Sequence, residues 1–176
     1  KHGANPQLNP QPFFEAGPHD LSFDDGRPLA VYFEQRHCRQ CDTLHQKVLN
    51  HKIAKTQAEK MRSVQIDLWS DTPVTTPDGR ATTARAFARE LNIQFAPTIV
   101  FFDRTGQEVM RLDGAFRTFH TQAIFRYVND KAYLEHPNFQ RYLGALADHW
   151  RENGLDVDIW SYDLPVSQNG KAVVVY

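Results

Sequence analysis

Short apolar runs bounded by turn residues alternate with helical patterns along most of the chain. Leu29–Phe33 is an uninterrupted apolar run after the turn at Asp25-Gly26, which is typical of a buried strand. Val64–Leu68 alternates apolar and polar residues and predicts a second strand. The pattern adds two strands, 98–102 and 108–112, joined by a glycine-containing hairpin turn at 103–106.

Helical periodicity separates and follows these strands. Apolar residues from Cys41 onward recur at helical spacing to about Lys60, and Ala84, Phe87, Ala88 and Leu91 fall at i, i+3, i+4 and i+7. The predicted helices are 41–60, 84–91, 119–135 and 139–153, and residues 70–83 are predicted to be a long loop. The order of elements through residue 135 is β-α-β-α-β-β-α, which indicates an α/β domain.

The two ends of the chain differ from this central pattern. Residues 1–18 are rich in proline, asparagine and glutamine, so we expect an extended arm, followed by a domain at 19–135. Residues 136–176 are predicted to form a C-terminal extension packed on the domain, beginning with a helix. Its last part, around Gln168–Gly170, could form a β-ribbon or a tail packed along the domain, and the sequence does not distinguish these two alternatives.

Composition narrows the class of protein. Hydrophobic residues make up 41% of the chain and aromatic residues 12%, enough for a packed core. The formal net charge is −1, so we expect no nucleic-acid partner and no attraction to anionic lipid. No stretch approaches the ~20 apolar residues that cross a bilayer, so we expect a protein that is not membrane-embedded. The chain starts at Lys1 rather than Met, as a chain with a cleaved secretion signal does, and a trimmed chain starts the same way.

The chemistry centres on the two cysteines, Cys38 and Cys41, which form a CxxC motif. A bridge between them closes almost no loop, so it constrains the unfolded chain very little and its value is chemical. The motif lies between a predicted strand and helix, where free backbone N–H groups and the helix dipole favour a thiolate. We therefore expect Cys38 to attack a partner disulfide and the more shielded Cys41 to resolve the mixed disulfide.

Neighbouring cations are expected to tune the thiolate. Arg39 is adjacent to Cys38 and permanently charged, and His37 and His45 contribute in their charged forms. A single CxxC has two other interpretations, half of a zinc site and two incidental thiols. A structural zinc site needs two further ligands, and no second CxxC or compact His pair lies nearby. Two incidental thiols are disfavoured by the strand-to-helix position in a βαβ context.

These residues carry a family resemblance. The run Leu29–Phe33, the motif Cys38-Arg39-Gln40-Cys41, the segment Phe95–Phe102 and the turn before Arg111–Gly114 resemble the thioredoxin superfamily in order and spacing. The resemblance covers roughly residues 20–135. Within the superfamily, the residues before and after the CxxC are similar to bacterial extracytoplasmic thioredoxin-like proteins of the SoxW type.

The resemblance implies a thioredoxin-like fold, in which helices flank a central mixed sheet, and a protein thiol-disulfide oxidoreductase. It implies that Pro97 is the superfamily's cis-proline facing the CxxC, that Ala96 offers backbone groups to a bound peptide, and that Gly114 lines the same groove. Without it, Pro97 would be a proline that starts an edge strand. The implied partners are protein disulfides or thiols and a membrane thiol-electron donor, in the periplasm. No cofactor and no metal are expected, because the dithiol itself holds the electrons.

The chain departs from thioredoxins proper at several positions. Tyr32 holds the place of their buried aspartate, His37 replaces a tryptophan, and Arg39-Gln40 replaces Gly-Pro. Glu34, two residues beyond Tyr32 on the same strand face, is the candidate proton acceptor for Cys41, and a solvated carboxylate at a strand end is the alternative. Reduction of the partner is favoured slightly over oxidation. A copper-binding or copper-delivery protein of the same fold, and an interaction domain with a spectator disulfide, remain as other functions.

Overall fold

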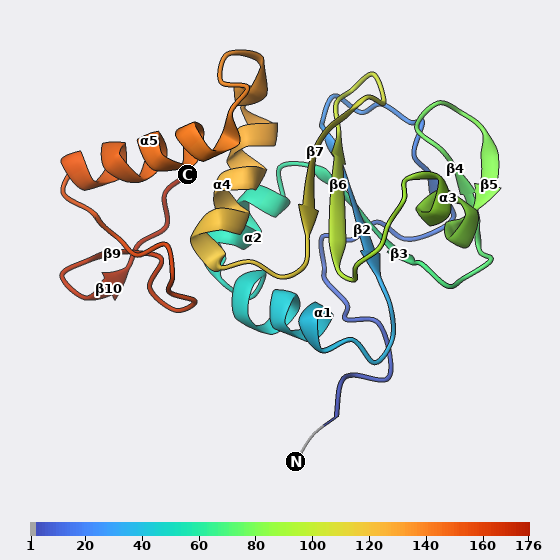
Figure 1. The fold of residues 1–176 in the computed structure, drawn as a ribbon, viewed down its shortest axis with the longest axis horizontal. Helices are drawn as coiled ribbons and strands as arrows, with labels where there is room; N and C mark the ends of the chain where they lie inside the picture. Colours follow the sequence, from blue (N-terminus) through green and yellow to red (C-terminus); the bar gives the residue numbers. More distant parts are fainter. Residues whose placement is uncertain (1–2) are drawn as a thin grey trace. The chain divides into compact units, whose positions relative to one another are not determined.

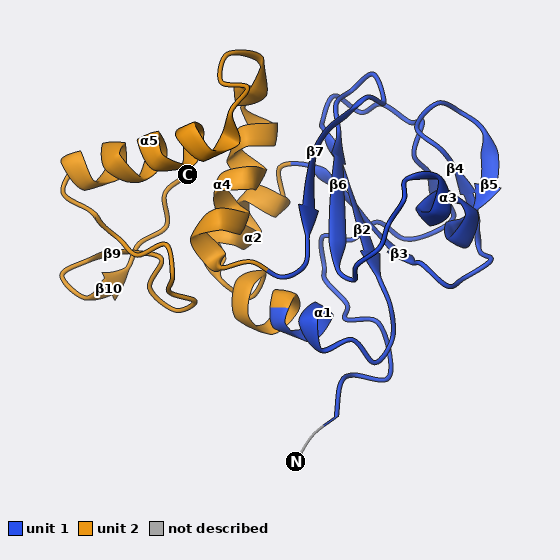
Figure 2. Ribbon diagram, viewed as in Figure 1, with its two compact units in different colours: residues 1–43, 61–115 blue, residues 44–60, 116–176 orange. Residues whose placement is uncertain are grey.

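The computed structural model describes residues 3–176, so residues 1 and 2 of the predicted arm lie outside the described residues. The described chain divides into two compact units, coloured separately in Figure 2. The first unit comprises the chain up to Thr43 together with Met61–Ala115, and the second comprises Leu44–Lys60 and Phe116–Tyr176.

A four-stranded mixed sheet is the centre of the first unit. Its strands, in spatial order, are β3 (Arg62–Asp67), β2 (Leu29–Glu34), β6 (Thr98–Phe102) and β7 (Glu108–Asp113). Strand β2 pairs parallel with β3 and antiparallel with β6, as Figure 1 shows, so Val31 lies opposite both Val64 and Val100. All six residues of β2 are buried, which explains why its first five residues form a continuous apolar run.

One face of this sheet carries a hydrophobic core. Leu29, Val31 and Phe33 project from β2 onto this face because alternate side chains of a strand point the same way. Helix α3 (Ala84–Glu90) contributes Phe87, whose ring centroid lies 5.7 Å from that of Phe33. The helix begins where its periodicity predicts, and Thr83 caps it by accepting a hydrogen bond from the backbone N–H of Ala86 at 3.2 Å.

The prediction of a long loop at residues 70–83 is wrong. Two short strands lie there, β4 (Pro73–Thr75) and β5 (Ala81–Thr83), paired antiparallel, and β1 (His19–Asp20) pairs parallel with β4. The turn between β4 and β5 is held by Thr76, whose hydroxyl accepts from the N–H of Arg80 at 3.0 Å. Strands of three residues are too short to show the alternation on which the sequence pattern depends.

The single helix predicted over 41–60 is also wrong. The segment forms α1 (Arg39–Thr43), then the π-helix η1 (Leu44–Val48), and then α2 (Lys52–Ala58). In the π turn the N–H of Leu49 donates to the carbonyl of Leu44 at 2.8 Å, five residues back. His51 is extended, with φ −81° and ψ 130°, and separates η1 from α2. The spacing of apolar residues correctly predicts that the segment is helical, but it does not show where the helix is interrupted.

The arm is tied to the first unit by backbone and side-chain contacts. Phe14 forms a parallel bridge with Ser63, and its ring lies 4.9 Å from that of Tyr32, between centroids. Gln65 of β3 donates to the carbonyl of Asn9 at 2.7 Å. The described part of the arm is therefore irregular in conformation but fixed by specific partners.

The second unit is built on helices. They are the π-helix η1, α2, α4 (Thr118–Asn129), the 3₁₀-helix η2 (Ala132–Leu134) and α5 (Phe139–Glu152). Its core centres on Phe119, whose ring meets that of Trp150 edge-on at 5.8 Å, with Ile53 and Ala123 in the same cluster. Helix α4 ends before the predicted residue 135, because the backbone turns left-handed at Lys131, with φ 54°.

The C-terminal residues form a small antiparallel sheet in the order β10-β9-β8. Its strands are β8 (Asp156–Val157), β9 (Val166–Gln168) and β10 (Lys171–Ala172). Asn169 and Gly170 turn between β9 and β10 with positive φ of 53° and 75°, as a tight hairpin requires. Of the two readings left open, the ribbon is the one present. Among residues 3–176, no helix combines the length and apolar character needed to span a membrane.

Candidate functional site

The two cysteines form a disulfide at the junction between β2 and α1. Their Cα atoms are 5.2 Å apart. Helix α1 begins at Arg39, so Cys38 is the residue immediately before it and Cys41 lies within its first turn. His37, with φ 54°, makes the sharp change of direction from the end of β2 into the helix.

The two sulfurs differ in environment. Cys38 is 6% exposed and Cys41 is 1% exposed, so the residue nearer the helix start is the more accessible one. The backbone N–H of Cys41 donates to Sγ of Cys38 at 3.1 Å. A hydrogen-bond donor aimed at this sulfur stabilises negative charge on it, which favours the thiolate of Cys38 when the bridge is reduced.

The loop before β6 lies against the disulfide. The Ala96–Pro97 peptide bond is cis, and the carbonyl oxygen of Ala96 lies 3.6 Å from Sγ of Cys38. Pro97 precedes β6, which pairs with β2 on one side and β7 on the other, so it does not start an edge strand. The structure therefore places the carbonyl of Ala96, the residue before Pro97, beside Cys38, and the role of both residues in binding a peptide stays a prediction.

Gly114 joins the same group of residues. Its N–H donates to the carbonyl of Pro97 at 2.7 Å. Its φ of +82° is a conformation that side chains rarely adopt, and a Cβ placed there would lie 3.5 Å from Oε1 of Gln40. The side-chain oxygen of Gln40, within the CxxC motif, therefore lies beside Gly114. No pattern in the sequence predicts that these two residues are close together.

Glu34 and Tyr32 occupy the face of β2 opposite the Phe33 side. Glu34 is the last residue of the strand and is fully buried, so it is not the solvated carboxylate that the sequence also allowed. Burial, and then the negative charge of Glu34, raise the pKa of Tyr32. The phenol is therefore neutral and cannot accept a proton, which leaves Glu34 as the buried carboxylate on this strand face.

The predicted cations lie in different places. His37 and Arg39 are exposed residues on either side of Cys38. His45 is buried in η1 and belongs to the second unit. Its role at the thiols remains a prediction.

Sequence reasoning missed several residues beside the motif. Asn5 and Asn9 of the arm hydrogen-bond the carboxylate of Asp42, the residue after Cys41. The exposed Trp69 donates from its indole N–H to Oε1 of Gln35, in the loop before the motif, at 2.7 Å. Neither contact has a periodic signal, because each joins a loop or arm residue to a distant part of the chain.

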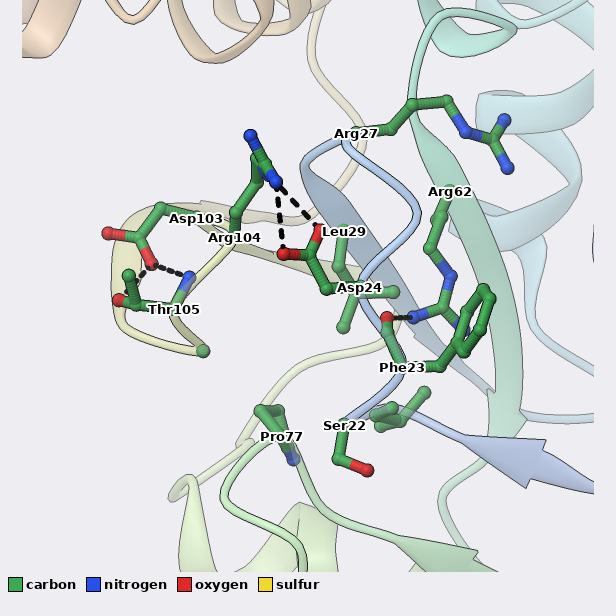
Figure 3. Close-up of a pocket in the computed structure, with 12 residues that line it drawn as sticks. Ser22, Phe23, Asp24, Arg27, Leu29, Arg62, Pro77, Asp103, Arg104 and Thr105 are labelled. Carbon is green, nitrogen blue, oxygen red and sulfur yellow. Dashed lines mark hydrogen bonds and ion pairs between the residues drawn. The ribbon is translucent and has the colours of Figure 1, made fainter.

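Beyond the disulfide, the described residues offer no metal site, and the charges in the hollow beside the β6–β7 hairpin are paired. Between residues 3 and 176, no group of three or more His, Cys, Asp or Glu side chains is placed to hold a metal ion. A hollow of about 70 Å³ lies beside the β6–β7 hairpin (Figure 3). Its charged groups are already paired: Arg104 binds Asp24 at 3.1 Å, and Arg62 donates to the carbonyl of Phe23. In residues 3–176, both cysteine sulfurs lie at the CxxC motif.

The sequence matches a family model described as a thioredoxin-like domain over residues 24–129. The chain belongs to this thioredoxin-like family. The match includes the CxxC motif and the Ala96–Gly114 segment, and the predicted α/β thioredoxin-like fold is confirmed. No curated protein sequence matches this thioredoxin-like chain.

Solved structures support the same fold. A thioredoxin-fold protein from Helicobacter pylori aligns with a TM-score of 0.61 at 16% identity, covering 74% of this chain and 88% of that protein. A thioredoxin from Thermus thermophilus is 24% identical, with a TM-score of 0.47, and the alignment covers 58% of this chain and 74% of that thioredoxin. The likeness to the Helicobacter pylori protein, at 16% identity, supports the thioredoxin-like fold and nothing finer.

Proposed function

We propose that this thioredoxin-like protein is a thiol-disulfide oxidoreductase that exchanges the Cys38–Cys41 dithiol and disulfide with partner proteins. One observation supports this above all. The more exposed sulfur, that of Cys38, sits at the start of a helix with a backbone N–H directed at it. This is the environment that makes a cysteine nucleophilic.

The reaction needs two exchanges. The Cys38 thiolate attacks one sulfur of a partner disulfide, a mixed disulfide forms, and the other partner sulfur leaves as a thiolate that takes up a proton. Cys41, after losing its proton to Glu34, then attacks Sγ of Cys38 and releases the second partner thiol. Two electrons pass from the dithiol to the partner, and the reverse sequence oxidises a partner dithiol.

The backbone around Ala96 and Pro97 fits a role in holding the partner. The carbonyl oxygen of Ala96 lies 3.6 Å from Sγ of Cys38, and the carbonyl of Pro97 is held by the N–H of Gly114 at 2.7 Å. The resemblance to thioredoxins assigns the same residues to a groove for an extended peptide. The proposed substrates are therefore protein segments that carry a disulfide or two thiols.

The finer assignments belong to the same proposal. The similarity to SoxW-type proteins favours a periplasmic reductant that receives electrons from a membrane thiol-transfer protein. The direction is open to a direct measurement. A midpoint potential near the about −270 mV of a thioredoxin means a reductant, and one near the roughly −120 mV of a strong periplasmic oxidant means disulfide insertion.

Two cysteine variants test the proposal. Cys38→Ser is expected to abolish reduction of insulin disulfides, whereas Cys41→Ser keeps the attacking thiol and is expected to accumulate mixed disulfides with substrate. The redox couple is measured by equilibrating the wild-type protein in thiol-disulfide buffers and counting free thiols. Full insulin reduction by the Cys38 variant, or the absence of a reversible two-electron couple in the wild type, contradicts the proposed function.

A further inference from the structure

Residues 5–9 of the arm contact both ends of the CxxC loop. The backbone N–H of Asn5 donates to one carboxylate oxygen of Asp42 at 3.0 Å, and the side-chain amide of Asn9 donates to the other at 2.9 Å. The carbonyl of Asn5 accepts from the N–H of His37 at 2.8 Å. The arm thus holds the residue before Cys38 and the residue after Cys41 at once. We call Asn5, Asn9 and Asp42 the arm clamp.

The clamp is itself anchored. Asn9 is only 9% exposed, and its carbonyl accepts from the side chain of Gln65 in β3 at 2.7 Å. The side-chain amide of Asn5 donates to Oδ1 of Asn9 at 3.3 Å. Both asparagines therefore have fixed positions relative to the sheet of the first unit, and the carboxylate of Asp42 is fixed with them.

Asp42 lies one helical turn beyond Cys38. The N–H of Asp42 donates to the carbonyl of Cys38 at 3.0 Å, the spacing of one helical turn. Side chains four residues apart on a helix are neighbours, with Cβ atoms about 5–6 Å apart. A carboxylate one helical turn from Cys38 opposes formation of a thiolate on Cys38, and it does so less when hydrogen-bond donors neutralise part of its charge.

We propose that Asn5 and Asn9 are positioning residues, which hold the Asp42 carboxylate on the arm side and thereby make the Cys38 thiolate easier to form. This inference rests on the proposed function, since it assigns a role in the same thiol chemistry. The other charged groups near the motif are Arg39, His37 and Glu34, together with Arg36, which lies 4.0 Å from Asp67. None of them is changed in the test below.

The test compares two variants with opposite expected effects. Asp42→Asn removes the charge and keeps an acceptor for the clamp, so the reduced protein is expected to alkylate at Cys38 about threefold faster at pH 7. A unit charge about 6 Å away has an effect of this size at a water-like dielectric. Asn9→Ala releases the carboxylate and is expected to slow alkylation. Mass spectrometry after reaction with iodoacetamide assigns the rate to Cys38.

The midpoint potential is the second readout. A more stable thiolate stabilises the reduced form, so Asp42→Asn is expected to shift the potential toward a more oxidising value and Asn9→Ala toward a more reducing one. The control is Asp24→Asn, which removes the same charge at an exposed pair with Arg104 and is expected to leave both readouts unchanged. A purely structural clamp would change the melting temperature without these opposite shifts.

The outcomes separate the inference from the proposed function. Wild-type protein without a reversible couple overturns the function. A reversible couple together with an Asp42→Asn variant that matches wild type in both rate and potential overturns the clamp alone, as does a shift of both variants in the same direction. If Asn9→Ala does not fold, the nearly isosteric Asp42→Asn variant still decides, because its predicted direction stands by itself.

Discussion

Arg62 offers the sharpest test of how the arm is held. Its side chain, 4% exposed, donates from Nε and Nη2 to both carboxylate oxygens of Glu15 at 2.9 Å. It also donates to the backbone carbonyls of Asp20, at 3.0 Å, and Phe23. One guanidinium therefore joins β3 to three places in the segment before β2. Arg62→Met keeps a similar length of side chain and removes every one of these donors.

The cost can be worked out bond by bond. Each hydrogen bond from a charged donor contributes about 1.5–3 kcal/mol, and the carbonyls of Asp20 and Phe23 belong to exposed residues, where water replaces part of the lost bond. Glu15 is 32% exposed, so water replaces part of its lost partner. The total is about 2–4 kcal/mol of the free energy of unfolding, because water replaces part of what each acceptor loses.

Urea unfolding measures this cost, followed by far-UV circular dichroism and by tryptophan fluorescence, which in the first unit comes from Trp69. Arg104→Met is the matched control, because its pair with Asp24 is 51% and 41% exposed and is expected to contribute about 1 kcal/mol or less. If Arg62→Met costs no more than this control, the assignment of Arg62 as the fastening of the arm is refuted.

Three further predictions concern single residues. Gly106→Ala places a Cβ 3.1 Å from atoms of Pro77 at φ +86° and is expected to lose about 1–2 kcal/mol of stability in urea, more than Gly26→Ala, which has open space at φ +92°. Burial lowers the pKa of His120, so the stability that the neutral imidazole contributes is present above about pH 6.5 and is lost as the pH falls toward the pKa of the folded state. The free energy of unfolding, measured in urea at pH 7.5 and pH 5, should therefore fall less between these pH values in His120→Gln than in the wild type. Glu34→Gln is expected to slow release of the mixed disulfide by about 10²-fold in stopped-flow assays, and an unchanged rate removes Glu34 as the proton acceptor.

The parts of the fold that were predicted correctly are those with a strong local pattern. Strand β6 was expected at 98–102 and spans Thr98–Phe102, and α3 and β2 differ from expectation by one residue at an end. In each case burial imposes a period or a continuous apolar run that is visible in the sequence. The position of the cysteines between a strand and a helix was also predicted correctly, because the apolar run of β2 stops a few residues before Cys38 and helical spacing begins at Cys41.

The missed features depend on contacts between distant residues. The three-residue strands β4 and β5 are stabilised by pairing with each other, and nothing in Pro73–Thr75 alone requires a strand. The arm clamp joins residues 37 positions apart through asparagine, a residue type common in loops without such partners. The contact of Gln40 with Gly114 likewise exists only after the sheet has formed.

The geometry of the thiols follows from the interior position of β2. Because β2 and β6 are antiparallel, Phe33 near the end of β2 lies opposite Thr98 at the start of β6. The loop that leaves β2 and the loop that enters β6 therefore emerge at the same end of the sheet, which brings Cys38 within 3.6 Å of Ala96, 58 residues away. Because β2 is hydrogen-bonded to β3 and β6, its end has a fixed position in the sheet. The short loop from β2 to Cys38 therefore fixes the position of the reactive sulfur. A change that loosens β2 should thus reduce thiol reactivity even when no residue of the CxxC motif is altered.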